Sequence, residues 1–359
     1  MNTRIIKIII FFKEHWPIVS IFVFALVIRM YFSLTTQMPE FNSEMHNNVA
    51  KALEWKLTQS DAPIYPLFLK VIYSIFGEGN HTSALIIQGL IGSLMVIVIY
   101  LLVLQVCNRR AALLSAGICG IYPAFIIFEI SLFPESLLIF LAVCIMALSV
   151  SVKINQKKKS ILLGALMGLG MLTKPTFLFF LPGLALTTKK RLLFLLTLII
   201  VLIPWTARNA VVSRTLYPLY QPKAYMVDLS KYTFSKESLG LFNRLYTNTS
   251  FVLRKSWDEP NMPKLFENRH NNTGLLQYSY TVVLILGLIG MVRFYRKEHR
   301  QFMLPVLLYI VLVIFFTFVK HRYRMLFEPA LIVYTAILLA GGSCEARSLQ
   351  DTSGTGRDG

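Results

Sequence analysis

The sequence predicts an all-α protein, a polytopic transmembrane helical bundle of about ten spans. Hydrophobic residues make up 55% of the 359 residues and only 15% are charged, whereas soluble domains carry about 25% charged residues. Apolar runs long enough to cross a bilayer core of about 30 Å recur along the chain. Lys and Arg gather in short segments between these runs, as they do in cytoplasmic loops.

The net charge of +18 is explained by these basic segments. A charge of this size can indicate nucleic-acid binding, but the sequence has no basic module with interleaved stacking residues. We therefore expect no nucleic-acid partner. The basic segments are "NRR" (108–110), "KINQKKKS" (153–160), "KKR" (189–191) and "RFYRKEHR" (293–300).

The first half of the chain alternates between spans and short connections. Basic residues before the first apolar run put the N-terminus in the cytoplasm. Residues 35–82 then form an outer loop. It contains a helix that starts at Asn42 or Ser43, and an apolar segment, 63–77, that lies in the interface. Spans are expected at 17–34, 83–106, 111–130 and 134–152.

The run 161–186 lies between two basic loops and is too short for two full spans. Pro175 therefore predicts a break between two short helices. Residues 191–205 cross outward again. Later spans are expected at 274–292, 302–319 and 325–341. The chain thus divides into an N-terminal transmembrane module (1–206), a long outer segment (207–273), C-terminal spans (274–341) and a disordered cytoplasmic tail (342–359).

The cysteines predict neither a disulfide framework nor a zinc site. Three lie in or at the ends of apolar runs and one lies in the tail, without a CxxC pair or a Cys/His cluster. The four residues are Cys107, Cys119, Cys144 and Cys344.

Ionisable residues gather at one level, just beyond the outer ends of the spans. A single interfacial Arg or Lys usually snorkels to lipid headgroups, but carboxylates and arginines at one depth indicate a functional site. A guanidinium binds a phosphate and a carboxylate takes a proton from a hydroxyl, so the site suits chemistry on a lipid phosphate. The residues are Glu44, Asp61, Glu129, Glu135, Arg208, His321, Arg322 and Arg324.

Several segments together resemble the GT-C glycosyltransferases, in particular the dolichyl-phosphate-mannose protein mannosyltransferase and aminoarabinose transferase group, glycosyltransferase family 39. The resemblance covers most of residues 17–341. It departs from the pattern at Glu44, where the family has Asp, and at Asn48, where it has Tyr. The segments are Arg29, "EMHNNVAKAL" (44–53), "PIYPLFLKVIYSIFG" (63–77), "YPAFIIFEISLFPESLLIFL" (122–141), "GLGMLTKP" (168–175), "IPWTARN" (203–209) and "RYRMLFEP" (322–329).

The resemblance implies a GT-C-like architecture with juxtamembrane helices in the outer loops. It also implies inverting transfer of a sugar from a polyprenyl-phosphate donor to an acceptor hydroxyl on a lipid, a glycan or a protein. Glu44 is the expected general base and Glu135 a second catalytic candidate. The expected donor-phosphate ligands are Arg208, Arg322, Arg324 and Arg29.

We expect no cofactor, and no metal by default, with a divalent metal left open as an alternative. The expected location is the bacterial inner membrane, with both termini cytoplasmic and the active site on the outer face. Two alternatives stay open: an O-antigen polymerase or ligase acting on polyprenyl-linked glycans, and a flippase or transporter. The order of segments 63–77 and 203–209 favours the glycosyltransferase, and we find no transporter-like internal repeat.

Overall fold

A computed structural model describes residues 3–35, 43–54, 57, 61–213, 272–316, 321–342 and 344. In these ranges the regular structure is helical, without strands, so the all-α prediction is confirmed. Most of the expected outer segment 207–273 and of the tail 342–359 lies outside the described residues.

Four helices of the described ranges are long and apolar enough to cross a membrane. A fifth candidate consists of α5 (Arg109–Ile121) and α6 (Pro123–Glu129), which meet at an angle of 51°. Pro123 has no backbone N–H to continue the helix, which explains the bend. The four long segments are His15–Thr35 of α1 (Thr3–Thr35), α4 (His81–Val106), Arg191–Val212 of α10 (Arg191–Ser213), and Lys297–Phe316, which joins η5 (Lys297–His299) to α13 (Arg300–Phe316).

The remaining helices are shorter or less apolar, so the count of about ten spans stays a prediction. The break expected at Pro175 is confirmed, because α8 ends at Thr173 and the next helical turn begins at Pro175. The remaining helices are α2 (Ser43–Glu54), α3 (Ile64–Phe76), α7 (Glu135–Val150), α8 (Gln156–Thr173), η1 (Pro175–Phe180), α9 (Leu181–Thr187), α12 (Asn272–Phe294), η6 (His321–Leu326) and α14 (Glu328–Leu339).

Asparagine side chains cap three helices at their first turns. Asn80 accepts a hydrogen bond from the backbone N–H of Ser83 at the start of α4 (3.1 Å). Asn108 does the same for α5, and Asn155 for α8. Each cap satisfies one of the N–H groups that a helix start leaves without an intrahelical partner.

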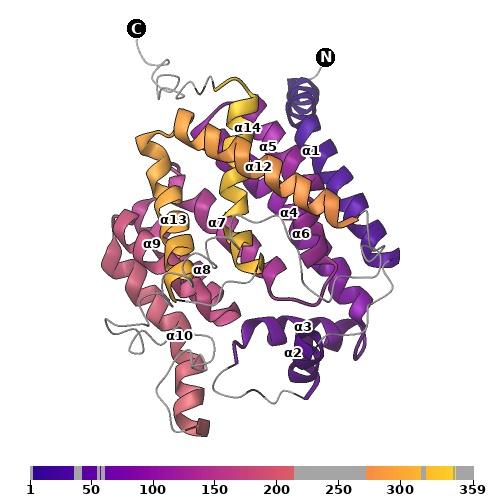
Figure 1. Ribbon diagram of the computed structural model, residues 1–359, viewed down its shortest axis with the longest axis vertical. Coiled ribbons are helices and arrows are strands. Elements are labelled where there is room, and N and C mark those ends of the chain that lie inside the picture. Colours follow the sequence, from indigo (N-terminus) through magenta and orange to yellow (C-terminus); the bar gives the residue numbers. More distant parts are fainter. Residues whose placement is uncertain are drawn as a thin grey trace, which may run out of the picture.

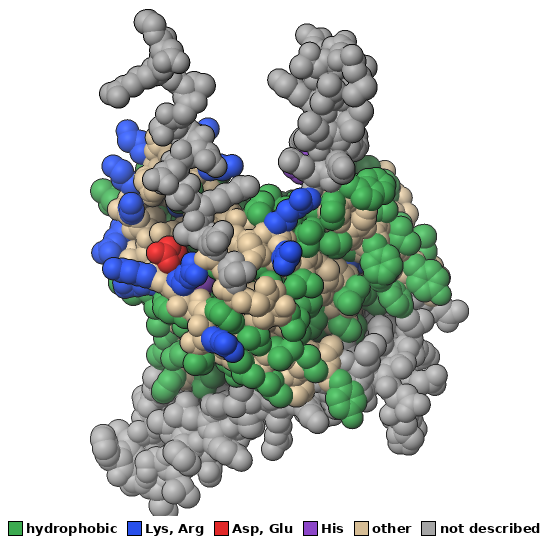
Figure 2. Space-filling view, turned by 90° about the horizontal axis from the view of Figure 1, so that it is seen from above, with side chains coloured by type: hydrophobic (Ala, Val, Ile, Leu, Met, Phe, Trp, Pro, Cys, Tyr) green, Lys and Arg blue, Asp and Glu red, His purple; other side chains and the backbone are tan. Residues whose placement is uncertain are grey.

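Helix α4 lies at the centre of the bundle, where it contacts α1, α5 and α7. The start of α1 and the end of α14 lie at one end of the molecule, whereas α2 and α3 lie at the opposite end (Figure 1). Lys and Arg side chains gather on the face seen from above in Figure 2. Exposed basic residues of the interhelical connections include Arg109, Arg110, Lys153, Lys157, Lys158, Lys189, Lys190, Arg293, Arg296 and Lys297.

A buried ion pair joins α1 to α6 inside this bundle. The Arg29 Nε atom lies 2.6 Å from Glu129 Oε2, and both side chains are at most 2% exposed. The Arg29 guanidinium also donates to the carbonyl of Gly120, at 2.7 Å. Gly92 of α4 faces the Glu129 carboxyl group, and a Cβ atom at position 92 would overlap it. The missing side chain of Gly92 therefore makes room for the pair.

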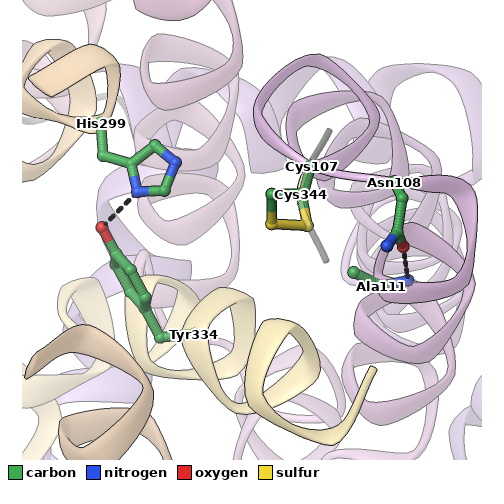
Figure 3. The surroundings of a disulfide bond; sticks show 6 residues. All are labelled: Cys107, Asn108, Ala111, His299, Tyr334 and Cys344. Carbon is green, nitrogen blue, oxygen red and sulfur yellow. Dashed lines mark hydrogen bonds between the residues drawn. A yellow bond between two sulfur atoms is a disulfide. The ribbon is translucent and has the colours of Figure 1, made fainter. Parts of the chain in front are cut away.

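The structure contains a disulfide that the sequence analysis did not predict. Cys107, at the end of α4, is bonded to Cys344, with the two Cα atoms 4.4 Å apart (Figure 3). The two cysteines are separated by 237 positions in the sequence. No spacing motif links them, so the pairing depends on how the C-terminal segment packs. Beside it, His299 Nδ1 and the Tyr334 hydroxyl share a hydrogen bond of 2.9 Å.

We predict that Gly92→Ala lowers the thermal stability of the purified protein. The added methyl group overlaps the Glu129 carboxyl group and disturbs a buried ion pair, which costs about 3 kcal/mol or more. Thermal unfolding in detergent measures the effect. The matched control is Gly117→Ala, because a Cβ atom at position 117 meets open space. A Gly92→Ala variant as stable as the wild type would contradict the packing described here.

Candidate functional site

Three charged side chains meet at the end of the bundle that carries α2 and α3. Glu135, the first residue of α7, is 2% exposed. The Lys174 ammonium donates a hydrogen bond to Glu135 Oε1, and Arg322 Nη1 lies 3.6 Å from the same oxygen. We call these three residues the charge cluster. Two cations surround one carboxylate, so the cluster keeps a positive excess that favours an anion.

The break in the chain at Pro175 places Lys174 in the cluster. Lys174 has an extended backbone (φ −154°, ψ 122°) between α8 and η1, so it leaves the helical path. Its Nζ atom lies 4.9 Å from the centre of the Tyr323 ring, and Arg322 lies over the Phe133 ring at 5.7 Å. Aromatic faces attract such cations and limit the positions that their side chains adopt.

Helix α2 is held against the segment that leads into Glu135. The Asn48 side-chain amide donates to the carbonyl of Leu132, at 3.2 Å. At the other end of α2, Lys51 Nζ lies 2.5 Å from Asp61 Oδ1. Glu44 lies in the first turn of this helix, one turn before Asn48, and its side chain is outside the described residues. The fold thus brings the helix that contains Glu44 next to the charge cluster.

Gln88 of α4 also holds the segment that leads into Glu135. The sequence analysis did not select Gln88 as a site residue. Its amide nitrogen donates to the carbonyls of Glu129 (2.9 Å) and Ser131 (2.8 Å). Its amide oxygen accepts a hydrogen bond from the Tyr65 hydroxyl of α3, at 2.7 Å. A glutamine inside an expected span is costly unless its polar groups are paired, and that was the available signal.

An apolar groove with a volume of about 430 Å³ lies between α3, α8 and α10. Arg208 is the charged residue of its lining. The Arg208 guanidinium donates to the carbonyl of Leu57 and to Asn209 Oδ1, and it lies 4.8 Å from the Trp205 ring. The groove is therefore a hydrophobic surface with one cation in its lining. Other lining residues include Pro63, Leu67, Leu172, Val201 and Trp205.

The groove and the charge cluster are linked through the chain at the end of α8. Leu172 lines the groove, and Lys174 of the cluster follows two residues later in the chain. Helix α3 contributes Ile64 and Leu67 to the groove, while its Tyr65 binds Gln88 beside the segment before Glu135. The structure thus joins two of the expected site residues, Glu135 and Arg322, and adds Lys174 to them, whereas Arg208 lines the groove.

Two of the expected donor-phosphate ligands have internal partners instead. Arg29 is fully buried against Glu129. Arg324 is fully buried as well, with its Nε atom 3.0 Å from Glu328 Oε1 and its guanidinium 3.7 Å from the centre of the Tyr280 ring. Both side chains therefore lie in the interior of the bundle, each beside one carboxylate. The side chain of His321 lies outside the described residues.

Lys174 was missing from the sequence candidates because the sequence does not fix the side of the membrane that the α8–η1 break faces. The lysine directly before the helix-breaking proline was the available signal. No group of three or more His, Cys, Asp or Glu residues suited to a metal ion occurs in the described part of the chain.

Solved structures share this helical arrangement. ArnT from Cupriavidus metallidurans in the apo state matches with a TM-score of 0.64 and 13% identity, over 91% of this chain and 60% of ArnT. The complex of ArnT with undecaprenyl phosphate matches with a TM-score of 0.62 and 12% identity, over 90% of this chain and 60% of ArnT. A third match is the oligosaccharyltransferase AglB from Archaeoglobus fulgidus, in complex with an inhibitory peptide and a dolichol-phosphate. Its TM-score is 0.57 and its identity 15%, over 92% of this chain and 50% of AglB.

The chain therefore shares the fold of these structures, and it spans 50–60% of their length. Residues 60–207 match the profile of the family described as dolichyl-phosphate-mannose-protein mannosyltransferase. No curated protein matches the chain in sequence. The matched residues include α3, the charge-cluster residues Glu135 and Lys174, and most of α10.

We predict that the charges of Glu135 and Lys174 depend on each other for stability. Lys174→Gln and Glu135→Gln each leave a buried charge with fewer partners, which costs about 3 kcal/mol. In the double variant neither residue of the pair is charged. Its loss of stability is therefore smaller than the sum of the two single losses by about 1–3 kcal/mol.

Thermal or denaturant unfolding of the purified variants measures this coupling. Lys153→Gln is the control, because Lys153 is exposed at the opposite end of α7 and its replacement changes stability by less than about 0.5 kcal/mol. Strictly additive losses would show that Glu135 and Lys174 do not interact.

Proposed function

We propose that the chain is an inverting membrane glycosyltransferase that moves a sugar from a polyprenyl-phosphate donor to an acceptor hydroxyl. The observation that carries this proposal is the apolar groove with Arg208 in its lining, which includes Leu172 near the end of α8, two residues before Lys174 of the charge cluster. A prenyl chain needs an apolar surface, and its phosphate needs cations at the end of that surface.

Arg208 is the proposed ligand of the donor phosphate, with Arg322 and Lys174 as further cations. A guanidinium carries five N–H donors in a planar fork. The contacts of Arg208 with Leu57 and Asn209 leave donors for phosphate oxygens. Lys174 and Arg322 already surround Glu135, so a phosphate that enters the cluster would meet a net positive charge.

Glu44 is the proposed general base. Its carboxylate takes the proton of the acceptor hydroxyl, whose oxygen attacks the anomeric carbon of the donor sugar. The bond between the anomeric carbon and the phosphate oxygen breaks, and polyprenyl phosphate leaves with the electron pair. The attack occurs opposite the leaving group, so the configuration at the anomeric carbon inverts. Asn48 supports this role, because its bond to Leu132 fixes α2 beside the cluster.

Glu135 is less suited to the role of base in the state described by the structure. Lys174 Nζ and Arg322 Nη1 both pair with Glu135 Oε1. The two cations favour the ionised carboxylate and stand between that oxygen and an acceptor hydroxyl. We therefore propose that Glu135 positions Lys174 and Arg322, and it stays the second catalytic candidate after Glu44.

The ligands bound in the similar structures support the choice of donor. ArnT was solved with undecaprenyl phosphate, and AglB with a dolichol-phosphate and with an acceptor peptide. For this chain we propose a polyprenyl-phosphate sugar, with a lipid, a glycan or a protein as acceptor. An O-antigen polymerase or ligase remains the second candidate, because it uses the same class of lipid carrier. The GT-C fold weighs against a transporter.

We propose that the face rich in Lys and Arg (Figure 2) is cytoplasmic and that the groove and charge cluster lie at the outer face of a bacterial inner membrane. The Cys107–Cys344 bond lies at the cytoplasmic end in this orientation, and a reducing cytoplasm would oppose it. The orientation therefore depends on the distribution of basic residues and not on the cysteines.

The first prediction for this function is that Glu44→Gln lowers sugar transfer about 100-fold or more. The amide keeps the size of the side chain but cannot take a proton from the acceptor, and positioned base catalysis contributes about 10²–10⁴-fold. The assay follows a labelled sugar from polyprenyl-phosphate donors in purified membranes, with expression and thermal stability measured beside it.

Three outcomes of this assay are informative. Loss of transfer in Glu44→Gln at normal expression supports Glu44 as the base. Equal transfer by Glu44→Gln and the wild type removes Glu44 from that role and makes Glu135 the next candidate. If wild-type protein transfers no sugar from any polyprenyl-phosphate donor, the proposed function is wrong.

A separate prediction concerns donor binding. Arg208→Ala should raise KM for the polyprenyl-phosphate donor by about tenfold or more, because a charge-assisted contact with phosphate is worth about 1.5–3 kcal/mol. Arg191→Ala is the matched control, since Arg191 lies on the same helix at the end far from the groove. An unchanged KM in Arg208→Ala would place the phosphate elsewhere.

A further inference from the structure

A second cavity lies at the opposite end of the molecule from the groove. It has a volume of about 150 Å³ and lies between the end of α7, the start of α8, the end of α9 and the start of α13. We call it the polar pocket. A single water molecule needs only about 15 Å³ measured in the same way, so the polar pocket has room for a larger polar group.

The lining of the polar pocket is positively charged. Lys159 and Lys189 both line it, and its ten lining residues include no Asp or Glu. Lys159 is 7% exposed, and its Nζ atom donates to the carbonyl of Ser149 at 3.0 Å. Burial and the neighbouring Lys189 ammonium both lower the pKa of Lys159. Two ammonium groups near one cavity repel each other unless an anion lies between them.

The polar pocket also contains a hydroxyl group without a partner. Thr188 is 6% exposed, and its Oγ1 atom has no hydrogen-bond partner among the described residues. A buried hydroxyl usually has a partner, since leaving it unpaired costs about 1–3 kcal/mol. Gln156 and Gln301 add side-chain amide groups to the same lining. An oxygen-rich ligand in the pocket would supply the missing bond to Thr188.

We propose that the polar pocket binds a phosphate group at this end of the molecule. Phosphate fits because it is an anion with several acceptor oxygens, which suit two ammonium groups, a hydroxyl and amide N–H groups at once. A carboxylate has fewer oxygens to distribute among these donors. Nothing in the proposed sugar transfer uses this pocket, so the site is independent of the catalytic proposal.

Apolar side chains around the polar pocket indicate a lipid as the source of the phosphate. Val152 lines the pocket and is 82% exposed, and on the adjoining helices Leu186 and Leu192 are 54% and 71% exposed. Acyl chains would cover these side chains while the headgroup phosphate occupies the pocket. Basic pockets between membrane helices at the cytoplasmic surface bind anionic headgroups in this way. Free phosphate has the same charge and oxygens but no acyl chains.

The test compares lipid and phosphate binding by the full chain and its variants. Native mass spectrometry after exposure to phosphatidylglycerol or phosphatidylcholine measures lipid retention, and calorimetry measures inorganic phosphate binding. Lys189→Gln should weaken phosphatidylglycerol binding about tenfold, because it removes one charge-assisted contact. Thr188→Val removes only a hydroxyl and should cause a smaller loss. Lys190→Gln, the matched control, replaces an exposed neighbouring lysine that does not line the pocket.

The outcomes separate the two sources of phosphate. Preferential retention of phosphatidylglycerol that falls in Lys189→Gln and Thr188→Val, but not in Lys190→Gln, assigns the pocket to a lipid headgroup. Binding of inorganic phosphate that falls in the same two variants, without lipid preference, assigns it to a soluble phosphate. Equal binding by the wild type and all variants, equal loss in Lys190→Gln, or no binding of either ligand overturns the proposal.

Discussion

The buried ion pair between Arg29 and Glu129 is the interaction on which the arrangement of the site depends. Two charges in a low-dielectric interior are stable only when their hydrogen bonds are also made. The Arg29 guanidinium donates to the carbonyls of Ala25 and Gly120 and to Glu129 Oε1, and Gly92 leaves space for the carboxyl group. The pair fixes the end of α6, and the short segment after it leads directly to Glu135.

Hydrogen bonds from neutral side chains hold the segment between this ion pair and Glu135. Gln88 holds the carbonyls of Glu129 and Ser131, and Asn48 holds that of Leu132. Side chains of α4 and α2 thus both hydrogen-bond to the backbone before α7. A positioned carboxylate or cation needs this kind of support, because a displacement of about 1 Å can cost on the order of a hundredfold in rate.

The molecule separates its cations into groups with different roles. Arg29 and Arg324 are fully buried, each beside one carboxylate. Arg208 lines the apolar groove, and Lys174 and Arg322 surround the Glu135 carboxylate. Lys159 and Lys189 face the polar pocket at the other end. A cation that is paired with a carboxylate is less available to an anion. The carboxylates near each group therefore decide which arginine or lysine an anion can reach.

The sequence by itself determined the features that depend on local order. Composition and basic segments predicted a helical membrane protein, Pro175 predicted the break after α8, and the ordered motifs predicted the GT-C fold. Only the tertiary structure decided which distant groups meet. It joined Cys107 to Cys344, buried Arg29 and Arg324, and brought Lys174 to Glu135. Periodicity and propensity describe neighbours in the chain, whereas these contacts depend on how separate helices pack.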